Sequence, residues 1–443
     1  MLLIGNGKVL TRNEEEPYFE NGAVVTEGET IKEAGDFGEL RRKYPQAEFV
    51  DARGGIIMPG FINAHTHIYS ALARGLSIKG YSPANFLEIL EGMWWNIDRH
   101  LDLESVRASA RATVMDCIRQ GVTAIFDHHA SYCQIRGSLF AIGEVTREMG
   151  LRACLCYEVS DRDGEEKCLE GIRENVEFIR YARELSGDML KGMFGIHALF
   201  TVSDRTLERC VEANNGMAGF HLHVSEGLND LNYTLQKYGK RPVYRLRDWG
   251  ILGDRTILAH CIHVNSAEMD LIRATNTMVV NNPQSNMGNA VGCSPVLQMF
   301  EKGILVGLGT DAYTHDMLES AKAALAIQRH NAGLPNVAWR EVTEMLFYNN
   351  ARIAARFFDK PLGILKPGAA ADVIVMDYRP YTPFSHENAD GHMLFGMSGS
   401  QCRTTVVNGR VLMKDGEFTS IDEEKIKADI RLTAGKLWKS LGG

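Results

Sequence analysis

The chain has 443 residues, of which 45% are hydrophobic and 23% are charged, a composition typical of globular proteins and unlike that of disordered or fibrous chains. A formal charge of −8 and the lack of a basic stripe argue against nucleic acid as a partner. The sequence has no secretory leader pattern and no run of the roughly 20 apolar residues that a membrane span needs, so we expect a cytoplasmic protein without a membrane partner.

Short apolar runs separated by turn residues occupy both ends of the chain. The dipeptide Asn21-Gly22 near the start and the dipeptide Asn408-Gly409 near the end each adjoin such runs. Dipeptides of this kind are strong signals for two-residue β-hairpins. We therefore expect both ends to be rich in strands and to form one small β-domain beside the central part of the chain.

Between the two ends, eight short apolar runs alternate with longer segments of helical periodicity. The runs are residues 55–65, 122–129, 151–160, 191–200, 217–224, 256–264, 276–282 and 304–311. Their Val, Ile, Leu, Ala and Gly content without polar alternation is typical of parallel strands that are covered on both faces. Eight strand-helix units predict an α/β fold with a (β/α)8 barrel of the TIM type. An open doubly wound sheet is the alternative, weakened because no G-x-G-x-x-G motif follows the first run.

These patterns divide the chain into three parts. We expect a composite β-sandwich domain made of residues 1–55 plus 359–420, and a barrel over residues 56–358. A final helix is expected over residues 421–443.

Five of the eight runs have His or Asp as their last or next-to-last residue, and the carboxyl ends of barrel strands open on one face, where active sites are built. His65 and His67 are two residues apart on a strand, so both rings point to the same side and can bind one ion. A second H-x-H pattern occurs at His221 and His223, although chance supplies such a pattern on the order of 0.4 times in this composition. The distribution over several strand ends therefore counts for more than either motif.

Further polar side chains follow the later runs. Glu226 comes three residues after His223, where a carboxyl group could move protons near a bound water, although alone it would be a charge at a helix start. In the sixth run we expect the strand to end at His260, with His263 just past it, and Asp311 ends the eighth run. Three histidines and one carboxylate suit Zn²⁺, with Fe²⁺ or Mn²⁺ as alternatives, and leave a position for a water whose pKa falls toward ~7.

With these residues, the sequence resembles members of the amidohydrolase superfamily. Within that superfamily it is most similar to the branch that contains cytosine deaminase and the triazine chlorohydrolases (ATZ/TRZ). The resemblance covers nearly the whole chain, and within this branch the sequence is most similar to the SsnA-type aminohydrolases. It rests on the segments MPGFINAHTH, HLHVSE, AHCIHV, NNPQSN, GLGTD and LKPGAAADVIVMD.

The resemblance implies a role for each strand-end residue. The ligands of a single divalent metal ion, with Zn²⁺ preferred, are matched by His65, His67, His223 and Asp311. His260 matches the histidine that contacts the bound water and the substrate, and Glu226 matches the acid that shuttles protons. Asp311 would also accept the proton of the attacking water.

The resemblance further implies a mononuclear site. Two-metal members of the family carry a bridging carboxylated lysine near the end of the fourth strand, where this chain has His197. Lys191 lies at the start of that strand, too early to bridge. His197 is therefore expected to contact the substrate.

Other polar and aromatic side chains near the strand ends are candidates for substrate binding. They are Arg74, Trp94, His128, His129, His263 and Asn282. Each has a plainer interpretation: the two adjacent histidines could instead add a ligand or be buried structural residues, the tryptophan could pack in the core, and the asparagine could form a turn.

The predicted reaction is hydrolysis of a small nitrogen heterocycle. Metal-bound hydroxide would attack an sp² carbon of a purine, a pyrimidine or a triazine-like ring and release ammonia. The same hydroxide could alternatively open a cyclic amide or replace chloride, and a non-catalytic binding scaffold is the third reading. We expect a small-molecule substrate and a homodimer or a larger homo-oligomer.

Overall fold

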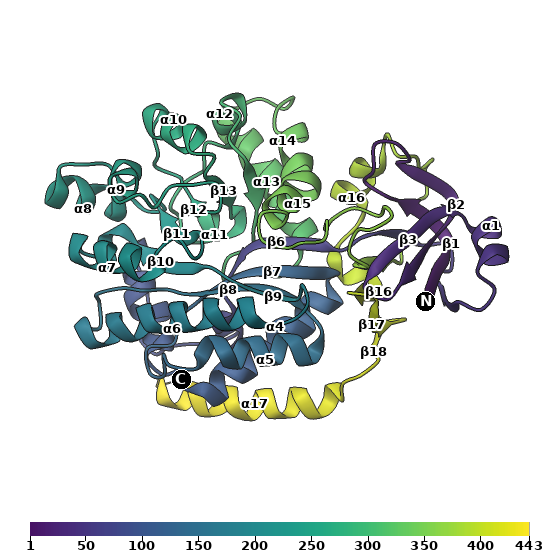
Figure 1. Cartoon of the computed structure of the whole chain (residues 1–443). Helices are drawn as coiled ribbons and strands as arrows, with labels where there is room; N and C mark the ends of the chain where they lie inside the picture. Colours follow the sequence, from purple (N-terminus) through teal and green to yellow (C-terminus); the bar gives the residue numbers. More distant parts are fainter. Residues whose placement is uncertain (443) are drawn as a thin grey trace.

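The computed structural model describes residues 1–442 and shows an α/β fold in which strands from both ends of the chain share one nine-stranded sheet (Figure 1). Its strand order is β18-β17-β16-β15-β5-β1-β2-β3, with β4 paired to β1. The bounds are β1 Leu2–Leu10, β2 Tyr18–Glu27, β3 Thr30–Asp36, β4 Glu48–Asp51, β5 Ile56–Pro59, β15 Val373–Met376, β16 Cys402–Val407, β17 Arg410–Lys414 and β18 Glu417–Phe418. The antiparallel pair of β5 and β15 joins the two ends.

The structure confirms one of the two hairpins predicted from Asn-Gly dipeptides and contradicts the other. Asn408 and Gly409 form the two-residue turn between β16 and β17, both at positive φ, which confirms that hairpin. Asn21-Gly22 lies inside β2, so the hairpin predicted there is wrong. A Cβ on Gly22 would lie 2.5 Å from Val9 Cγ2, so glycine serves close approach at a bulge, and the turn into β3 falls at Gly28.

The central part of the chain contains two parallel sheets. The first has the order β6-β7-β8-β9 and the second the order β10-β11-β12-β13-β14. The bounds are β6 Phe61–Thr66, β7 Val122–His129, β8 Arg152–Tyr157, β9 Leu190–Gly192, β10 Phe194–Ala198, β11 Phe220–Val224, β12 Ile257–His260, β13 Met278–Asn281 and β14 Val306–Leu308. Nearly all of these strand residues are buried, as the unbroken apolar runs predicted.

Two of the predicted runs are divided between sheets. The first run forms β5 in the nine-stranded sheet and then β6, because the Pro59-Gly60 break turns the chain into the central region. The fourth run forms β9 and β10, which belong to different parallel sheets. Single parallel bridges, Thr66 to Asp311 and Val159 to Ile196, connect the edges of the two parallel sheets. Within residues 1–442 the ladders are thus two sheets and not one closed barrel.

Helices cover the parallel sheets and part of the nine-stranded sheet (Figure 1). The α-helices are α1 Phe37–Lys43, α2 Phe86–Ile89, α3 Trp95–Asp98, α4 Leu103–Arg119, α5 Ser138–Met149, α6 Glu165–Glu184, α7 Asp204–Asn214, α8 Leu228–Tyr238, α9 Pro242–Asp248, α10 Ser266–Ala274, α11 Pro283–Gly288, α12 Val296–Glu301, α13 Met317–Ala332, α14 Trp339–Thr343, α15 Asn350–Ala354, α16 Ala389–Gly396 and α17 Glu423–Ser440. Other helical turns are η1 Ile68–Ala73, η2 Leu90–Trp94, η3 Leu199–Thr201, η4 Glu344–Asn349 and η5 Gly399–Gln401. None of the helices in the described chain is both long and apolar enough to cross a bilayer.

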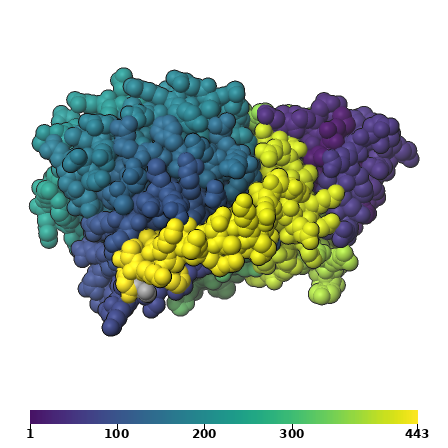
Figure 2. All heavy atoms as spheres, turned by 90° about the horizontal axis from the view of Figure 1, so that it is seen from below, coloured from purple at the N-terminus to yellow at the C-terminus, as the bar shows by residue number. Residues whose placement is uncertain are grey.

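The helix α17 runs along the outside of the central part and packs against α4 (Figures 1 and 2). It begins after Asp422, whose side chain accepts a hydrogen bond from the backbone N–H of Lys425. Near its other end, Trp438 Nε1 donates to the carbonyl oxygen of Leu72 in η1 at 2.7 Å. The C-terminal helix expected from the sequence is therefore present, and residue 443 lies outside the described residues.

A buried ion pair fastens the first parallel sheet to the nine-stranded sheet. The side chain of Arg152, at the start of β8, is fully buried, and two of its nitrogens lie 3.2 Å from the carboxylate oxygens of Asp372 just before β15. Asp372 also accepts the backbone N–H of Asn408 in the β16–β17 turn at 2.8 Å. One carboxylate thus holds a strand start and a hairpin together.

We predict that Asp372→Ala destabilises the protein by about 3–5 kcal/mol, because it leaves the Arg152 charge buried without its main partner. Thermal unfolding followed by circular dichroism measures the effect. Asp359→Ala is the matched control, since that carboxylate is 80% exposed in its pair with Lys191 and should change stability by less than about 1 kcal/mol. Equal melting temperatures for both variants would contradict the anchoring role.

Candidate functional site

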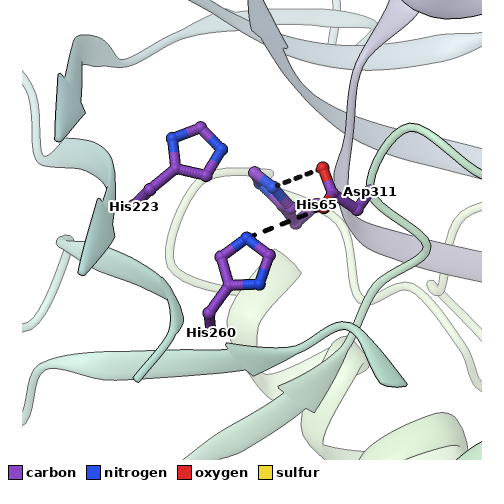
Figure 3. A group of neighbouring side chains, drawn as sticks. All are labelled: His65, His223, His260 and Asp311. Atoms are coloured by element: carbon purple, nitrogen blue, oxygen red, sulfur yellow. Dashed lines mark ion pairs between the residues drawn. The ribbon is translucent and has the colours of Figure 1, made fainter. Parts of the chain in front are cut away.

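Side chains at the carboxyl ends of β6, β11, β12 and β14 converge on one buried point (Figure 3). The possible ligand atoms of His65, His223, His260 and Asp311 all lie within 4.8 Å of one another. A second group with the same spacing consists of His67, His128 and His223. The structure therefore brings together all of the residues that the sequence nominated as ligands.

The backbone turns sharply where these side chains enter the site. Ser225 directly after β11, His260 at the end of β12 and Asp311 three residues after β14 all have positive φ, of 49°, 71° and 56°. Non-glycine residues rarely adopt this conformation, and it is concentrated at functional sites, where the surrounding structure holds it in place. The strand ends are thus bent so that their side chains face one another.

Hydrogen bonds to fixed acceptors determine which ring nitrogen of each histidine faces the centre. Nδ1 of His67 donates to the carbonyl oxygen of His128 at 2.6 Å, and Nδ1 of His223 donates to that of His197 at 3.0 Å. The Nε2 atoms of His67 and His223, with their lone pairs, then lie 3.1 Å apart. Two lone pairs at that distance repel unless a proton or a cation lies between them.

In His65 and His260, as in the other two histidines, Nδ1 has a partner outside the centre of the site. Nδ1 of His260 donates to Asn286 Oδ1 at 2.8 Å, and Nδ1 of His65 lies 2.9 Å from His221 Nε2. The Nε2 atoms of His65 and His260 are buried and have no hydrogen-bond partner among the described residues. Such orphaned acceptors fit a divalent cation, which would satisfy them at once.

His221 was not assigned a role from the sequence, and the structure places it behind His65. Its signal was the second H-x-H pattern: because His221 and His223 are two residues apart on β11, both rings point inward. A ring that accepts the Nδ1–H of His65 fixes the orientation of that histidine.

The two carboxyl groups of the site have opposite character. Asp311 Oδ1 lies 2.8 Å from His67 Nε2, and Asp311 also accepts a hydrogen bond from Ser285. Burial would raise the pKa of Asp311, but the neighbouring histidines, His67 first, hold it well below its usual range. Glu226 lies 3.5 Å from His260 Nε2, and burial followed by repulsion from Asp311 raises the pKa of Glu226 well above normal. The surroundings therefore favour the ionised form of Asp311 and the protonated form of Glu226.

A cavity opens in front of this group, with Glu226, His223 and Asp311 in its wall. Of the expected substrate contacts, His197 and Trp94 also line it. Arg74 lies instead in a neighbouring cavity, where it pairs with Asp116 at 2.7 Å.

The remaining candidates for substrate binding line neither of these two cavities. His128, His129 and Asn282 are completely buried, whereas His263 is partly exposed. His129 Nε2 is hydrogen-bonded to the hydroxyl of Ser131 at 3.0 Å, as a structural histidine would be.

Glu158, which the sequence analysis did not single out, also lines the cavity. It directly follows β8, and its signal was a charged residue at the end of an apolar run. Burial would raise the pKa of Glu158, but His197, His128 and Arg162 outweigh burial and hold the pKa at about 2. The wall of the cavity therefore carries a second charged carboxylate.

Comparisons with known proteins match the whole chain. The Amidohydrolase family matches residues 56–412, and an imidazolonepropionase-like composite domain of bacteria matches residues 22–47. The chain is 31% identical over 445 residues to a 5'-deoxyadenosine deaminase of Methanosarcina barkeri, covering 98% of each chain. It is 29% identical to a 5-methylthioadenosine/S-adenosylhomocysteine deaminase of Thermoanaerobacter pseudethanolicus, covering 98% of this chain and 99% of the relative.

Two solved structures share the fold. An adenosine deaminase from Xanthomonas campestris with bound zinc superposes with a TM-score of 0.86 at 20% identity, covering 98% of both chains. The zinc complex of the atrazine chlorohydrolase TrzN from Arthrobacter aurescens superposes with a TM-score of 0.81 at 21% identity, covering 98% of this chain and all of that one.

We predict that the orphaned histidine nitrogens bind one Zn²⁺ per chain. Protein stripped with a chelator should gain stability when Zn²⁺ is restored, by about 2.7 kcal/mol at a free concentration 100 times Kd. The double variant His65→Ala with His67→Ala should lose both the metal and the stabilisation. Elemental analysis and thermal unfolding measure the two effects, and His330→Ala, an exposed histidine on α13, is the control. A double variant that retains one Zn²⁺ per chain would show that the metal binds elsewhere.

Proposed function

This chain belongs to the amidohydrolase family, which matches residues 56–412, and we propose on that premise that it is a metal-dependent aminohydrolase acting on a small nitrogen heterocycle. The observation that carries the proposal is the cluster of histidine nitrogens with two buried carboxyl groups beside it, Asp311 and Glu226, whose pKa values are shifted in opposite directions. Curated relatives that match along the whole chain are named deaminases, which supports ammonia as the product.

The proposed ligands are the residues nominated by the sequence. One divalent ion, Zn²⁺ first, would be held by His65, His67, His223 and Asp311, with His260 next to it. Bound there, the ion supplies a Lewis acid that makes water nucleophilic at neutral pH. The two histidine groups share His223, which supports one ion and not two. Lys191 pairs with Asp188 at 3.1 Å and lines a different cavity, so no bridging lysine is available.

Different side chains of the site carry out the separate proton transfers of the reaction. Asp311, held ionised by His67 and His65, accepts a proton from the attacking water. Glu226, whose raised pKa favours the protonated form, donates its proton to a ring nitrogen of the substrate as the carbon becomes tetrahedral. Asp311 then passes its proton to the amino group, which leaves as ammonia, and the hydroxyl proton of the intermediate returns to Glu226. His260, fixed by Asn286, steadies the charge that develops on the attacking oxygen. His197 and Trp94 contact the heterocycle from the wall of the cavity.

The proposal includes the finer architecture. The single bridges between the edges of the two parallel sheets and the likeness to the two amidohydrolase-type structures support a (β/α)8 barrel over residues 56–358. A two-layer β-sandwich of residues 1–55 plus 359–420 stays a prediction, and β5 would extend its first part to Pro59. The SsnA-type resemblance, the homo-oligomer, the cytoplasmic location and the absence of nucleic-acid and membrane partners also stay predictions.

An assay of products tests the proposed reaction. Zinc-reconstituted protein is supplied with aminated purines, pyrimidines, triazines and 5'-deoxyadenosine, and released ammonia is measured. Chloride release from atrazine and ring opening of cyclic amides are measured beside it. Ammonia as the main product supports an aminohydrolase. Chloride or ring opening alone would instead establish one of the alternative hydrolyses, and no product at all would favour a binding scaffold.

We predict that Glu226→Gln lowers kcat for ammonia release by about 10²- to 10⁴-fold, because the amide cannot deliver the proton. The zinc content should stay at the wild-type value, since Glu226 is not among the proposed ligands. Glu166→Gln, an exposed glutamate on α6, should leave kcat unchanged. A Glu226→Gln variant with nearly full kcat would remove this residue from the mechanism.

A further inference from the structure

The cavity carries a charged carboxylate, Glu158, that the proposed chemistry does not use. Its side chain is almost entirely buried, and it lines the same cavity as Glu226. The two carboxyl groups approach the centre from different sides, Glu226 beside His260 and Glu158 beside His128. The His223 ring lies between them, 5.4 Å from the His260 ring and 4.6 Å from the His128 ring.

Glu158 is held rigidly from behind. Its Oε1 accepts a hydrogen bond from Arg162 at 3.1 Å, and Arg162 also pairs with the buried Asp98. The guanidinium group lies over the Tyr132 ring, 4.0 Å from its centre. These contacts occupy one oxygen of Glu158, and the other, Oε2, lies 3.6 Å from His128 Nδ1.

The Oε2 side of Glu158 lacks a donor. His128 donates its Nε2–H to the carbonyl oxygens of Ile196 and His221, each at 3.2 Å, which leaves Nδ1 as a lone pair. That Nδ1 is completely buried, has no hydrogen-bond partner in the described chain, and faces Glu158 Oε2 at 3.6 Å. Buried acceptors are normally satisfied, and of these two residues Glu158 lines the cavity, so we expect a donor on the substrate to meet the free oxygen of Glu158.

The other residues that line the cavity indicate which kind of substrate carries that hydrogen-bond donor. None of the described residues that line the cavity is a lysine or an arginine, so a phosphate or carboxylate group on the substrate would face Glu158, Glu226 and Asp311 uncompensated by a basic side chain. Trp94 and Phe200 add aromatic faces suited to a planar ring. The cavity therefore suits an uncharged heterocycle with a hydrogen-bond donor on one edge.

We propose that Glu158 binds a ring N–H next to the reacting carbon, so that the substrate is an amino heterocycle of the guanine type. In such a ring the carbon that bears the amino group lies between an unprotonated nitrogen and an N–H. Resting on the proposed function, this assigns Glu226 to the unprotonated nitrogen, which it protonates, and Glu158 to the N–H, from which it accepts a hydrogen bond. Ammonia leaves from the carbon between them.

An adenine-type ring fits this wall less well. Its reacting carbon is flanked by one unprotonated nitrogen and one carbon, so Glu158 Oε2 would remain without a donor. A buried charged acceptor that loses its partner is strongly unfavourable, and sites built around such an acceptor reject substrates that lack the donor. Glu158 thus acts on specificity.

Two matched pairs of probes test the proposal on zinc-loaded protein. Guanine and isocytosine carry the N–H beside the amino-bearing carbon, whereas 2-aminopurine and 2-aminopyrimidine lack it. Wild-type kcat/KM for ammonia release should favour the N–H member of a pair by about 10- to 100-fold. This comparison needs no variant, so it remains decisive even if a substituted protein folds poorly. Turnover of the donor-free member, or of 5'-deoxyadenosine, at an equal or higher kcat/KM would overturn the proposal while leaving an aminohydrolase.

The variant Glu158→Gln adds a second comparison. Its amide oxygen can still accept from Arg162, and its amide group can donate to His128 Nδ1, so the substrate N–H alone loses its acceptor. We expect the 10- to 100-fold preference to disappear, with the donor-free probes little affected. Glu177→Gln, in an exposed pair with Arg136, is the matched control and should retain the preference. A preference that survives in Glu158→Gln would exclude Glu158 as its source.

Calorimetric binding of the same probes separates the two levels of inference. If none of the compounds releases ammonia, the proposed function fails. Binding then decides the role of Glu158: tighter binding of the N–H probes to wild type than to Glu158→Gln supports it, and equal binding overturns it.

Discussion

The site depends on one electrostatic constraint: buried imidazole nitrogens that face each other and need a proton or a metal cation between them. The Nε2 atoms of His67 and His223 lie 3.1 Å apart because backbone carbonyl groups take up both Nδ1–H groups. Protonating either Nε2 would place a cation in a fully buried position, which is costly unless a carboxylate is near. Asp311 lies 2.8 Å from His67 Nε2 and supplies that charge. The arrangement is stable as a cation site and strained as a simple core.

Much of the surrounding fold can be understood as support for this constraint. Backbone carbonyl groups lie behind His67 and His223, and the side chains of Asn286 and His221 lie behind His260 and His65. Positive φ values at Ser225, His260 and Asp311 bend the strand ends inward, and such strain persists only in a rigid framework. The buried Arg152–Asp372 pair ties that framework to the nine-stranded sheet. Stability elsewhere thus compensates for strain at the centre.

The sequence predicted the elements whose signals are local. Unbroken apolar runs located the buried strands, and the residues that end those runs included the converging histidines and Asp311, since parallel strands share one carboxyl edge. Long-range pairing was not visible in the same way. The division of the first run into β5 and β6 depends on which sheet accepts each half, and Gly22 reflects a close approach to Val9 across a bulge. Glu158 and His221 gain their roles from contacts with Arg162, His128 and His65, which are distant or unpatterned in sequence.

The hydrogen bond from Trp438 in α17 to Leu72 in η1 joins two segments that are far apart in the sequence. The segment η1 directly follows His67, so α17 contacts a loop beside residues that are made much earlier in synthesis. Domains generally fold from the N-terminus during synthesis, and here that order cannot complete the site. A nascent chain that lacks α17 would expose the loop that follows β6 to solvent and to proteases. Removal of α17 would therefore uncover the loop beside His67, so a truncation within α17 is expected to disturb the site.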